Sequence, residues 1–189
     1  MRRLGIFGGR FDPPHIGHLI HARLVFENFN LDKILFIPAF TPPHKDVCAN
    51  FKDRSEMVKL AFTKETGFEL SRIEQEEKTS YTIDTLDKLK KRHPDADFFL
   101  IIGQDEYEAW ETWHQPDEIL KSVELIVLPR SKQASSTKPG VHFPDLPLIE
   151  ISSTTIRERI SKGRPVTNWI PEGVERYIKE KKLYKESHG

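Results

Sequence analysis

Short apolar runs alternate with longer segments of helical period along the chain. Six of the runs predict β-strands, and several are apolar nearly throughout, as in parallel strands covered on both faces: residues 4–7, 34–37, 68–73, 98–102, 125–128 and 148–151. Six further segments predict helices: residues 19–29, 54–64, 82–92, 117–121, 154–162 and 172–181. In the first of these, apolar residues form a helical stripe, at positions 19, 22, 25, 26 and 29.

The succession of strands and helices is typical of β-α-β units, whose crossovers are right-handed. We therefore predict an α/β fold, namely a doubly wound, Rossmann-like, mostly parallel sheet with helices on both faces. Such sheets bind ligands beyond the carboxyl ends of their strands, where the strand order reverses. No internal repeat or separating linker interrupts the pattern, so residues 1–189 are predicted to form a single domain. Residues 129–145, rich in Ser, Pro, Lys and Gln, predict a loop.

Composition narrows the class of protein. Hydrophobic residues make up 37% and charged residues 31% of the 189 residues, which excludes collagen-like, coiled-coil and fully disordered chains. The 29 Lys and Arg balance the 29 Asp and Glu, whereas proteins that coat nucleic acid or an anionic membrane usually carry a basic excess. We therefore expect no nucleic-acid and no membrane partner, and a local cluster of donors must hold any anionic ligand.

Cysteine use and hydropathy indicate the compartment. The single cysteine, Cys48, can form neither an intrachain disulfide nor a thiolate zinc site, and it is compatible with a reducing cytosol. The longest apolar run, residues 98–102, is far shorter than the ~20 residues of a membrane span. The opening apolar stretch ends at Gly8 and Gly9, too early for a signal peptide. We predict a cytoplasmic protein.

The first predicted strand runs directly into a loop that suits a phosphate. Gly8 and Gly9 let a phosphate approach the backbone, and the N-terminus of the next helix supplies free N–H groups and a positive dipole end. The spacing is neither that of a dinucleotide-binding G-x-G-x-x-G nor that of a P-loop. Its distinctive part is His15-Ile16-Gly17-His18, whose two imidazoles can donate hydrogen bonds to a phosphate. Alternatively, His15 and His18 are surface caps of the helix.

A third histidine, His21, raises the question of a zinc site. Asp12 is the only carboxylate close by in the sequence, and no second cluster completes a tetrahedral set of ligands. We therefore predict no protein-bound metal at these histidines.

The last predicted strand ends in a second group of anion ligands. Ser152, Ser153 and Thr154 bring hydroxyls to a helix start, with Ser153 as the predicted N-cap, and Arg157 follows one turn later. Taken alone, this segment is typical of a capped helix with a solvated arginine. Two anion-binding helix starts at the ends of two parallel strands, however, are what a triphosphate requires.

Together the two segments resemble the signatures of the HxGH nucleotidylyltransferase superfamily, whose second motif is I-S-S-T-x-I-R. The rest of the chain is similar to the bacterial nicotinate-nucleotide adenylyltransferase family within it. The similarity covers nearly the whole chain in order, through Ile37-Pro38, Pro42-Pro43-His44-Lys45, Arg54, Ser80-Tyr81-Thr82-Ile83-Asp84-Thr85, Ile101-Ile102-Gly103-Gln104-Asp105, Trp113, Ile170-Pro171, Tyr177-Ile178 and Leu183-Tyr184.

This resemblance implies transfer of AMP from ATP to nicotinate mononucleotide, with deamido-NAD and pyrophosphate as products, in NAD biosynthesis. It also implies Mg²⁺, carried with ATP, as the cofactor. The sequence itself shows no activated nucleophile, because nothing near Cys48 fixes a base or a helix dipole on it. Catalysis is then expected to rest on positioning and on neutralising charge around the transferred group.

The resemblance further implies roles for individual residues. His15 and His18 are expected to be catalytic and to contact the ATP phosphates, with His18 as the main donor to the transition state. Asp105 is expected to accept ribose hydroxyls; alternatively it is an ordinary helix N-cap. The other implied ATP-binding residues are Gly8, Gly9, Gly103, Ser152, Ser153, Thr154 and Arg157, the last four for the β and γ phosphates.

Nicotinate mononucleotide is expected to bind Lys45, Thr82 and Trp113. Thr82 offers a hydroxyl and free N–H groups at a helix start to the carboxylate, and Trp113 offers its indole face to the ring, with Trp110 as a competitor. Lys45 and Arg54 are implied as phosphate-side cations; alternatively either one is a solvated surface charge.

Three positions depart from the family pattern: Arg10 in place of Thr or Ser, Gln104 in place of Ala or Ser, and Glu106 in place of an apolar residue. Arg10 either faces the phosphates or points to solvent. Within the superfamily, the alternative is an adenylyltransferase for nicotinamide mononucleotide or another small acceptor. In a different class, it is a non-catalytic nucleotide sensor on the same fold. The sequence specifies no oligomeric state.

Overall fold

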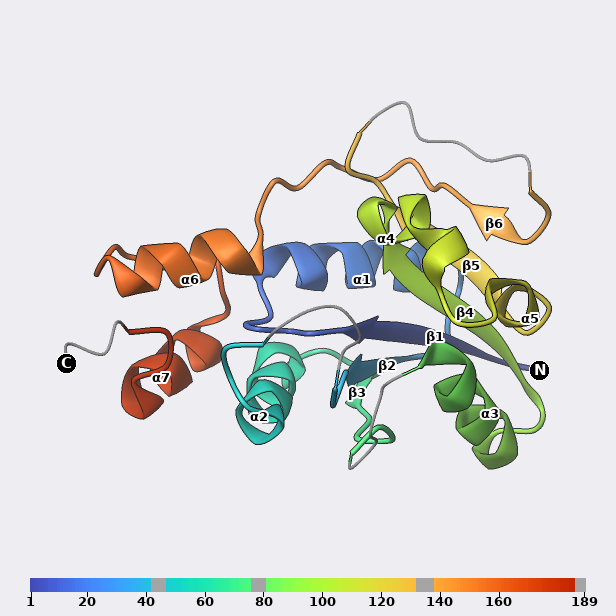
Figure 1. Ribbon diagram of the computed structural model, residues 1–189, viewed down its shortest axis with the longest axis horizontal. Helices are drawn as coiled ribbons and strands as arrows, with labels where there is room; N and C mark the ends of the chain where they lie inside the picture. Colours follow the sequence, from blue (N-terminus) through green and yellow to red (C-terminus); the bar gives the residue numbers. More distant parts are fainter. Residues whose placement is uncertain (42–46, 76–80, 132–137, 186–189) are drawn as a thin grey trace.

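A parallel sheet organises the chain, as seen in a computed structural model that describes residues 1–41, 47–75, 81–131 and 138–185. Its strands lie in the order β3-β2-β1-β4-β5-β6, and all neighbours are parallel (Figure 1). The strands are β1 (Arg2–Gly9), β2 (Lys33–Pro38), β3 (Phe68–Leu70), β4 (Ala96–Gly103), β5 (Glu124–Leu128) and β6 (Val141–His142). The predicted doubly wound α/β fold is confirmed.

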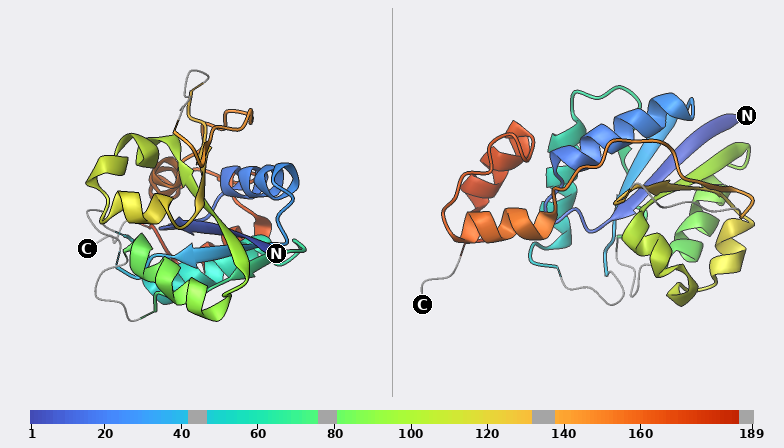
Figure 2. Two further views of the ribbon diagram at one scale, coloured as in Figure 1. Left: turned by 90° about the vertical axis from the view of Figure 1, so that its right-hand side faces the viewer. Right: turned by 90° about the horizontal axis from the view of Figure 1, so that it is seen from above.

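Helices cover both faces of this sheet, as the end-on view in Figure 2 shows. They are α1 (Ile16–Asn28), α2 (Phe51–Phe62), α3 (Thr82–Arg92), α4 (Gln104–Glu108), α5 (Pro116–Leu120), α6 (Ser153–Ser161) and α7 (Glu172–Lys181), with a 3₁₀ turn, η1 (Trp110–Thr112). Helices α1, α2, α6 and α7 supply buried residues to one face, whereas α3, α5 and η1 supply the other.

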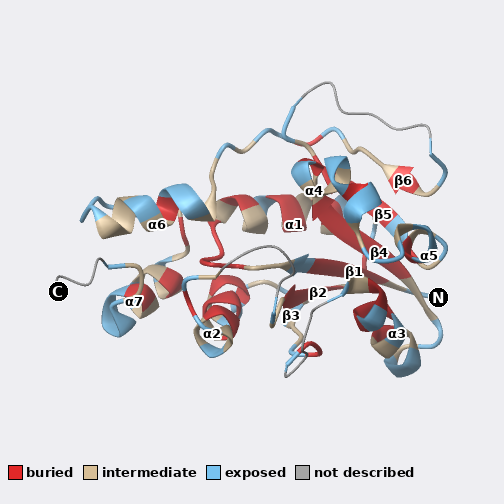
Figure 3. Ribbon diagram, viewed as in Figure 1, coloured by how far each residue is buried: buried red, intermediate tan, exposed pale blue. Residues whose placement is uncertain are grey.

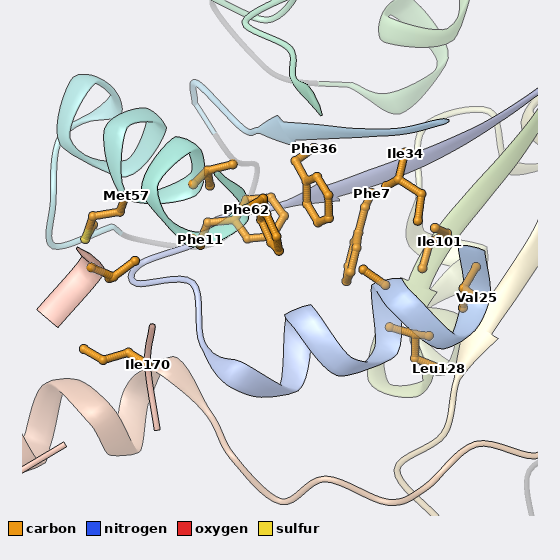
Figure 4. Close-up of a cluster of buried hydrophobic side chains, with 14 of the residues drawn as sticks. Phe7, Phe11, Val25, Ile34, Phe36, Met57, Phe62, Ile101, Leu128 and Ile170 are labelled. Carbon is orange, nitrogen blue, oxygen red and sulfur yellow. The ribbon is translucent and has the colours of Figure 1, made fainter. Parts of the chain in front are cut away.

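The strand side chains alternate between two separate cores, because successive residues of a strand point to opposite faces. Phe7, Phe36 and Ile101 belong to the cluster under α1 and α2, shown in Figure 4. Their neighbours Ile6 and Leu35 belong to the cluster under α3 and α5. Both faces are therefore apolar along the central strands, which are buried in Figure 3. This explains why the strands read as continuous apolar runs.

One predicted strand is wrong. Residues 148–151 form no strand, and the sixth strand is instead β6, which lies inside the predicted loop 129–145 and pairs with β5. Pro144 and Pro147 supply no N–H to a ladder. The carbonyl of Pro147 accepts a hydrogen bond from Nε2 of His21 at 2.9 Å, and Leu148 remains 38% exposed. The segment therefore connects β6 to α6 beside α1.

Several helix boundaries also differ from the prediction. Helix α1 begins at Ile16 rather than 19, so the histidine motif lies in its first turn. The N-cap of α6 is Ser152, not Ser153, because Oγ of Ser152 accepts from the Thr155 amide at 3.1 Å. Helix α4 and η1 were missed, since five and three residues are too short for a helical stripe. Helices α3 and α7 have the predicted bounds.

The strand order reverses at β1, which lies between β2 and β4. The carboxyl ends of β1 and β4 therefore flank the switch point, where doubly wound sheets bind ligands. Gly8 and Gly9 end β1, and Gly103 ends β4. Helices α6 and α7 lie beyond this edge of the sheet (Figure 1).

Candidate active site

The histidine motif forms a compact structure at the N-terminus of α1. The rings of His15 and His18 stack with centroids 3.7 Å apart, and the amide of His15 donates to Nδ1 of His18 at 3.1 Å. A Cβ added at Gly17 would lie 3.1 Å from both Nδ1 of His15 and a methyl of Ile149. The glycine between the histidines is therefore needed for the ring of His15 to pack over the helix start.

Burial keeps these histidines neutral. His15 is only 7% exposed, and desolvation, with smaller effects of the Arg130 and His21 charges, lowers its pKa to about 3. The ring of His18 packs edge-on against Phe7 and Phe11, and burial lowers its pKa as well. The two residues do cap the helix, His15 as its N-cap and His18 by accepting from the His15 amide, but His15 is buried and His18 half-buried rather than on the surface.

The hydrogen bonds around the pair define which ring atoms can meet a ligand. Because Nδ1 of His18 accepts from a backbone amide, the neutral ring carries its proton on Nε2. Within the described part of the chain, Nδ1 of His15 is buried and has no hydrogen-bond partner. An unpaired buried polar atom costs about 1–3 kcal/mol.

Side chains of α2 and α6 hold the loop before α1 by donating to its backbone carbonyls. Arg54 donates to the carbonyl of Arg10 at 2.9 Å, Arg157 to that of Asp12 at 2.8 Å, and the Ser153 hydroxyl to that of Pro13 at 2.8 Å. The start of α6 and the loop before α1 are thereby brought together, as the sequence predicts for its two anion-binding segments.

Arg54 is neither a solvated charge nor an evident phosphate ligand. Its side chain is fully buried, and its guanidinium donates to the carbonyls of Ala49 at 3.0 Å and Phe40 at 3.4 Å, besides that of Arg10. Burial lowers the pKa of Arg54, against the opposing effect of Asp12. Arg54 thereby connects α2 to the loop before α1.

The end of β4 shows which residue caps α4 and which residue lies beside Asp105. Gly103 is the N-cap of α4, so the alternative role of Asp105 as N-cap is wrong. The Asp105 carboxylate is exposed and lies 3.7 Å from Nε of Arg130. Gln104 holds Arg130 in place, since its Oε1 accepts from the amides of Arg130 and Ser131 at 2.8 and 3.0 Å.

Arg130 is the cation that our sequence analysis missed. Its charge contributes to the lowered pKa of His15, His18 and His21, which places it near all three rings. It follows β5 directly, at the carboxyl edge of the sheet. The rule that ligands bind at this edge, applied to every residue after an apolar run, would have found it.

The residues implied for the pyridine ring lie around the start of α3. Thr82 is its first residue, and the ring of Tyr81, the N-cap, lies 4.6 Å from that of His114. Trp113 is half-buried, whereas Trp110 beneath it is 3% exposed with ring centroids 4.9 Å apart. Burial makes Trp110 a core residue and leaves Trp113 as the accessible indole. Lys45 lies outside the described residues.

Among the described residues, neither a candidate metal site nor a membrane-spanning helix is found. No three His, Cys, Asp or Glu side chains among them cluster closely enough to hold a metal ion, and His21 instead bonds to Pro147. No helix formed by these residues is long and apolar enough to cross a membrane.

The chain belongs to the cytidylyltransferase-like class. A family model described as Cytidylyltransferase-like matches residues 6–159. The structure also resembles that of Plasmodium falciparum nicotinic acid mononucleotide adenylyltransferase complexed with NaAD, with a TM-score of 0.85 at 19% identity, over 97% of this chain and 98% of that one. At this identity the likeness concerns the fold.

Sequence comparison narrows the class further. The chain is 44% identical over 187 residues to the probable nicotinate-nucleotide adenylyltransferase of Bacillus pumilus, covering 97% of this chain and 99% of the relative. It is 42% identical over 188 residues to the nicotinate-nucleotide adenylyltransferase of Bacillus subtilis, again covering 97% and 99%. The chain therefore belongs to the nicotinate-nucleotide adenylyltransferase family, and the resemblance inferred from its motifs is confirmed.

Proposed function

We propose that this protein transfers the adenylyl group of ATP to nicotinate mononucleotide, forming deamido-NAD and pyrophosphate in NAD biosynthesis. The observation that carries the proposal is the stacked pair of His15 and His18 at the switch point, whose preceding loop is joined to the start of α6 by hydrogen bonds. Relatives at 42–44% identity that bear the name of this activity support it.

The reaction exchanges one phosphorus–oxygen bond for another. An oxygen of the mononucleotide 5′-phosphate bonds to the α-phosphorus of ATP while the bond from that phosphorus to pyrophosphate breaks. Charge develops on the transferred group and on pyrophosphate, and preorganised donors stabilise it. We expect His18 to donate from Nε2 as a neutral ring, because its Nδ1 accepts from the His15 amide. His15 is expected to contact the ATP phosphates beside it.

The start of α6 is proposed to hold the β and γ phosphates. The N–H groups of Ser153 and Thr154 belong to the first turn, where a helix offers no acceptor. Ser152 caps the helix, and Arg157 and Ser153 hold the loop through their side chains. We therefore expect these residues to act twice, by orienting the loop and by contacting the phosphates. Gly8 and Gly9 keep the backbone accessible to them.

The remaining contacts are proposed for the two nucleosides. Gly103 and Asp105 are assigned to the ribose of ATP, with Arg130 as an added cation on the phosphate side. Thr82 is assigned to the nicotinate carboxylate and Trp113 to the face of the pyridine ring. Lys45 keeps its assignment to the mononucleotide as a prediction from the motif.

We propose that Mg²⁺ enters with ATP as part of the substrate. The donors near the histidines are imidazoles, hydroxyls and arginines, which suit phosphate oxygens, whereas Mg²⁺ prefers carboxylates and water. When bound, the ion would neutralise charge on the phosphates. The cytoplasmic location stays a prediction from the composition.

The test is pyrophosphate release from ATP and Mg²⁺ with nicotinate mononucleotide, with nicotinamide mononucleotide, and with no acceptor. We expect release with the acid form well above that with the amide. Equal use of both acceptors would favour a nicotinamide-mononucleotide enzyme. ATP binding without release in any mixture would favour the nucleotide sensor.

A further inference from the structure

Asp12 lies at the centre of the loop that leads to the histidines. Its carboxylate is 1% exposed, and it accepts from the amides of Cys48 at 2.6 Å and Ala49 at 3.1 Å. It also accepts from the hydroxyl of Tyr184 at 2.7 Å. Hydrogen bonds to a carboxylate are among the strong ones in proteins. A buried carboxylate depends on them, since an unpaired charge in the interior is costly.

Tyr184 reaches this carboxylate from the far end of the chain, 172 positions away. Helix α7 ends with Lys182 in the left-handed region, at φ 54°, and the amide of Leu183 donates back to the carbonyl of Ile178 at 3.1 Å. This reversal turns the chain toward the loop. Burial and the neighbouring Asp12 carboxylate raise the pKa of Tyr184, so its hydroxyl keeps the proton that it donates.

Tyr184 and the residue before Asp12 both lie on strained backbone. Tyr184 has φ 62°, and Phe11, which precedes Asp12, has φ 49°. Bulky L-residues rarely adopt this left-handed conformation. Such strain persists only where surrounding contacts impose it, and it is most frequent at functional sites. The contact between Tyr184 and Asp12 is a contact of this kind.

The loop has little freedom left once these bonds form. Arg54, Arg157 and Ser153 hold its carbonyls, as described above, and Tyr184 holds the side chain in its middle. Asp12 is three residues before His15. A displacement of about 1 Å at a reacting group can cost 10²-fold in rate. The position of Asp12 therefore determines how well the two histidines meet the phosphates.

We propose that Tyr184 is a positioning residue for adenylyl transfer: by donating to Asp12, it fixes the loop that presents His15 and His18. The proposal rests on the proposed function. It assigns the residues after α7 to the support of the active site, because Tyr184 acts through Asp12. Loss of its hydroxyl should leave the fold intact and let the loop move.

The chain supplies a matched control. Tyr177, on α7, donates its hydroxyl to Oδ1 of Asp53 at 2.8 Å. Asp53 belongs to α2, where its amide donates to Asn50 and its carboxylate accepts from Tyr177 rather than from the loop. Tyr177→Phe and Tyr184→Phe each remove one phenol–carboxylate hydrogen bond from the same terminal segment, so a general loss of stability should affect both alike.

The experiment compares the full-length parent, Tyr177→Phe and Tyr184→Phe by thermal unfolding, by kcat and KM for ATP, and by hydrogen exchange of peptides from residues 8–18. We expect similar melting temperatures for both variants. Tyr184→Phe should lose about 10-fold to 100-fold in kcat and exchange faster over residues 8–18, whereas Tyr177→Phe should match the parent in both. Equal exchange in the two variants would overturn the proposal, even if the parent showed no adenylyltransferase activity.

A double variant separates positioning from a general weakening of the fold. If Tyr184 acts through His18, adding Tyr184→Phe to His18→Ala should cost much less in kcat than it costs alone, because neighbouring effects are then not additive. The same cost in both backgrounds would show that the tyrosine acts independently of the histidine. An inactive parent with faster exchange in Tyr184→Phe would reject the proposed function and keep the loop contact.

Discussion

Around the start of α1, hydrogen bonds join residues that are 36 to 172 positions apart; around the start of α3, Thr85 bonds to Glu74 and Tyr81, 11 and 4 positions away. We call the first region, residues 8–18 with the start of α6, the histidine end, and the second, Thr82 with Trp113, the pyridine end. Charge stabilisation depends on fixed donors, and the histidine end has long-range bonds to fix them. Recognition of a flat ring needs shape and a few donors, which local structure supplies.

The largest expected effect is on the histidine end. His18→Ala removes a preorganised donor, and such a loss typically lowers kcat by about 10²–10³. Steady-state kinetics with nicotinate mononucleotide measure it, with circular dichroism to confirm the fold. His21→Ala is the matched control, since His21 lies one turn further along α1 and bonds to Pro147. A normal kcat in His18→Ala would show that the ring of His18 has only a structural role.

The second-largest expected effect is on the preference for the acid over the amide acceptor, which the pyridine end is proposed to determine. A carboxamide would turn one N–H₂ donor toward the donors of Thr82, and each unpaired buried group costs roughly 1–3 kcal/mol, about 10-fold to 100-fold in specificity. Thr82→Ala should lower the ratio of kcat/KM for nicotinate mononucleotide to kcat/KM for nicotinamide mononucleotide by up to that factor. Trp113→Ala should weaken both acceptors alike, because an indole stacks on either ring. A changed ratio in Trp113→Ala but not in Thr82→Ala would reverse these roles.

The smallest effect concerns pH and stability. The pKa of His15 falls from 6.5 to about 3 on folding, so between these values the unfolded chain binds a proton that the native protein does not. The free energy of unfolding therefore decreases as the pH falls from 6.5 toward 3, by at most about 1.4 kcal/mol per pH unit for this group. Above pH 6.5 the effect vanishes.

Urea unfolding of the parent and His15→Gln at pH 7, 6 and 5 measures this contribution. We expect a shallower decrease in the variant, since glutamine takes up no proton. If the free energy of unfolding depended on pH identically in both proteins, the ring of His15 would be solvated in the native protein. The histidine end would then be less buried, relative to the pyridine end, than the structure indicates.

The fold could be predicted from the sequence because its helices and central strands depend on neighbours in the chain, whereas the pyridine end stays a prediction from the family resemblance. Apolar runs gave the central strands, and helical period gave α3 and α7. The strand predicted at residues 148–151 was wrong, because an apolar run that follows Pro147 does not reveal which partner it meets. Trp113 and Trp110 could be proposed but not separated, since burial depends on packing.

The histidine end was predicted only in part. The motif located His15 and His18, but their burial, the role of Arg54 and the contact between Asp12 and Tyr184 depend on segments that meet only in three dimensions. Arg130 follows an apolar run, a signal that the sequence analysis did not use, and Tyr184 entered only as part of the family resemblance. Long-range contacts of this kind determine the geometry of the site, and a window of sequence does not contain them.

The bond between Asp12 and Tyr184 also has a consequence for protein synthesis. A ribosome has made every strand of the sheet once β6 is complete, yet neither α6 nor Tyr184 exists at that stage. Chains begin to fold from their N-terminal part as they are made, and contacts between distant residues form late. We expect a nascent chain of that length to hold a formed sheet with an unfinished phosphate loop. The protein would then stay inactive until Tyr184 has been synthesised.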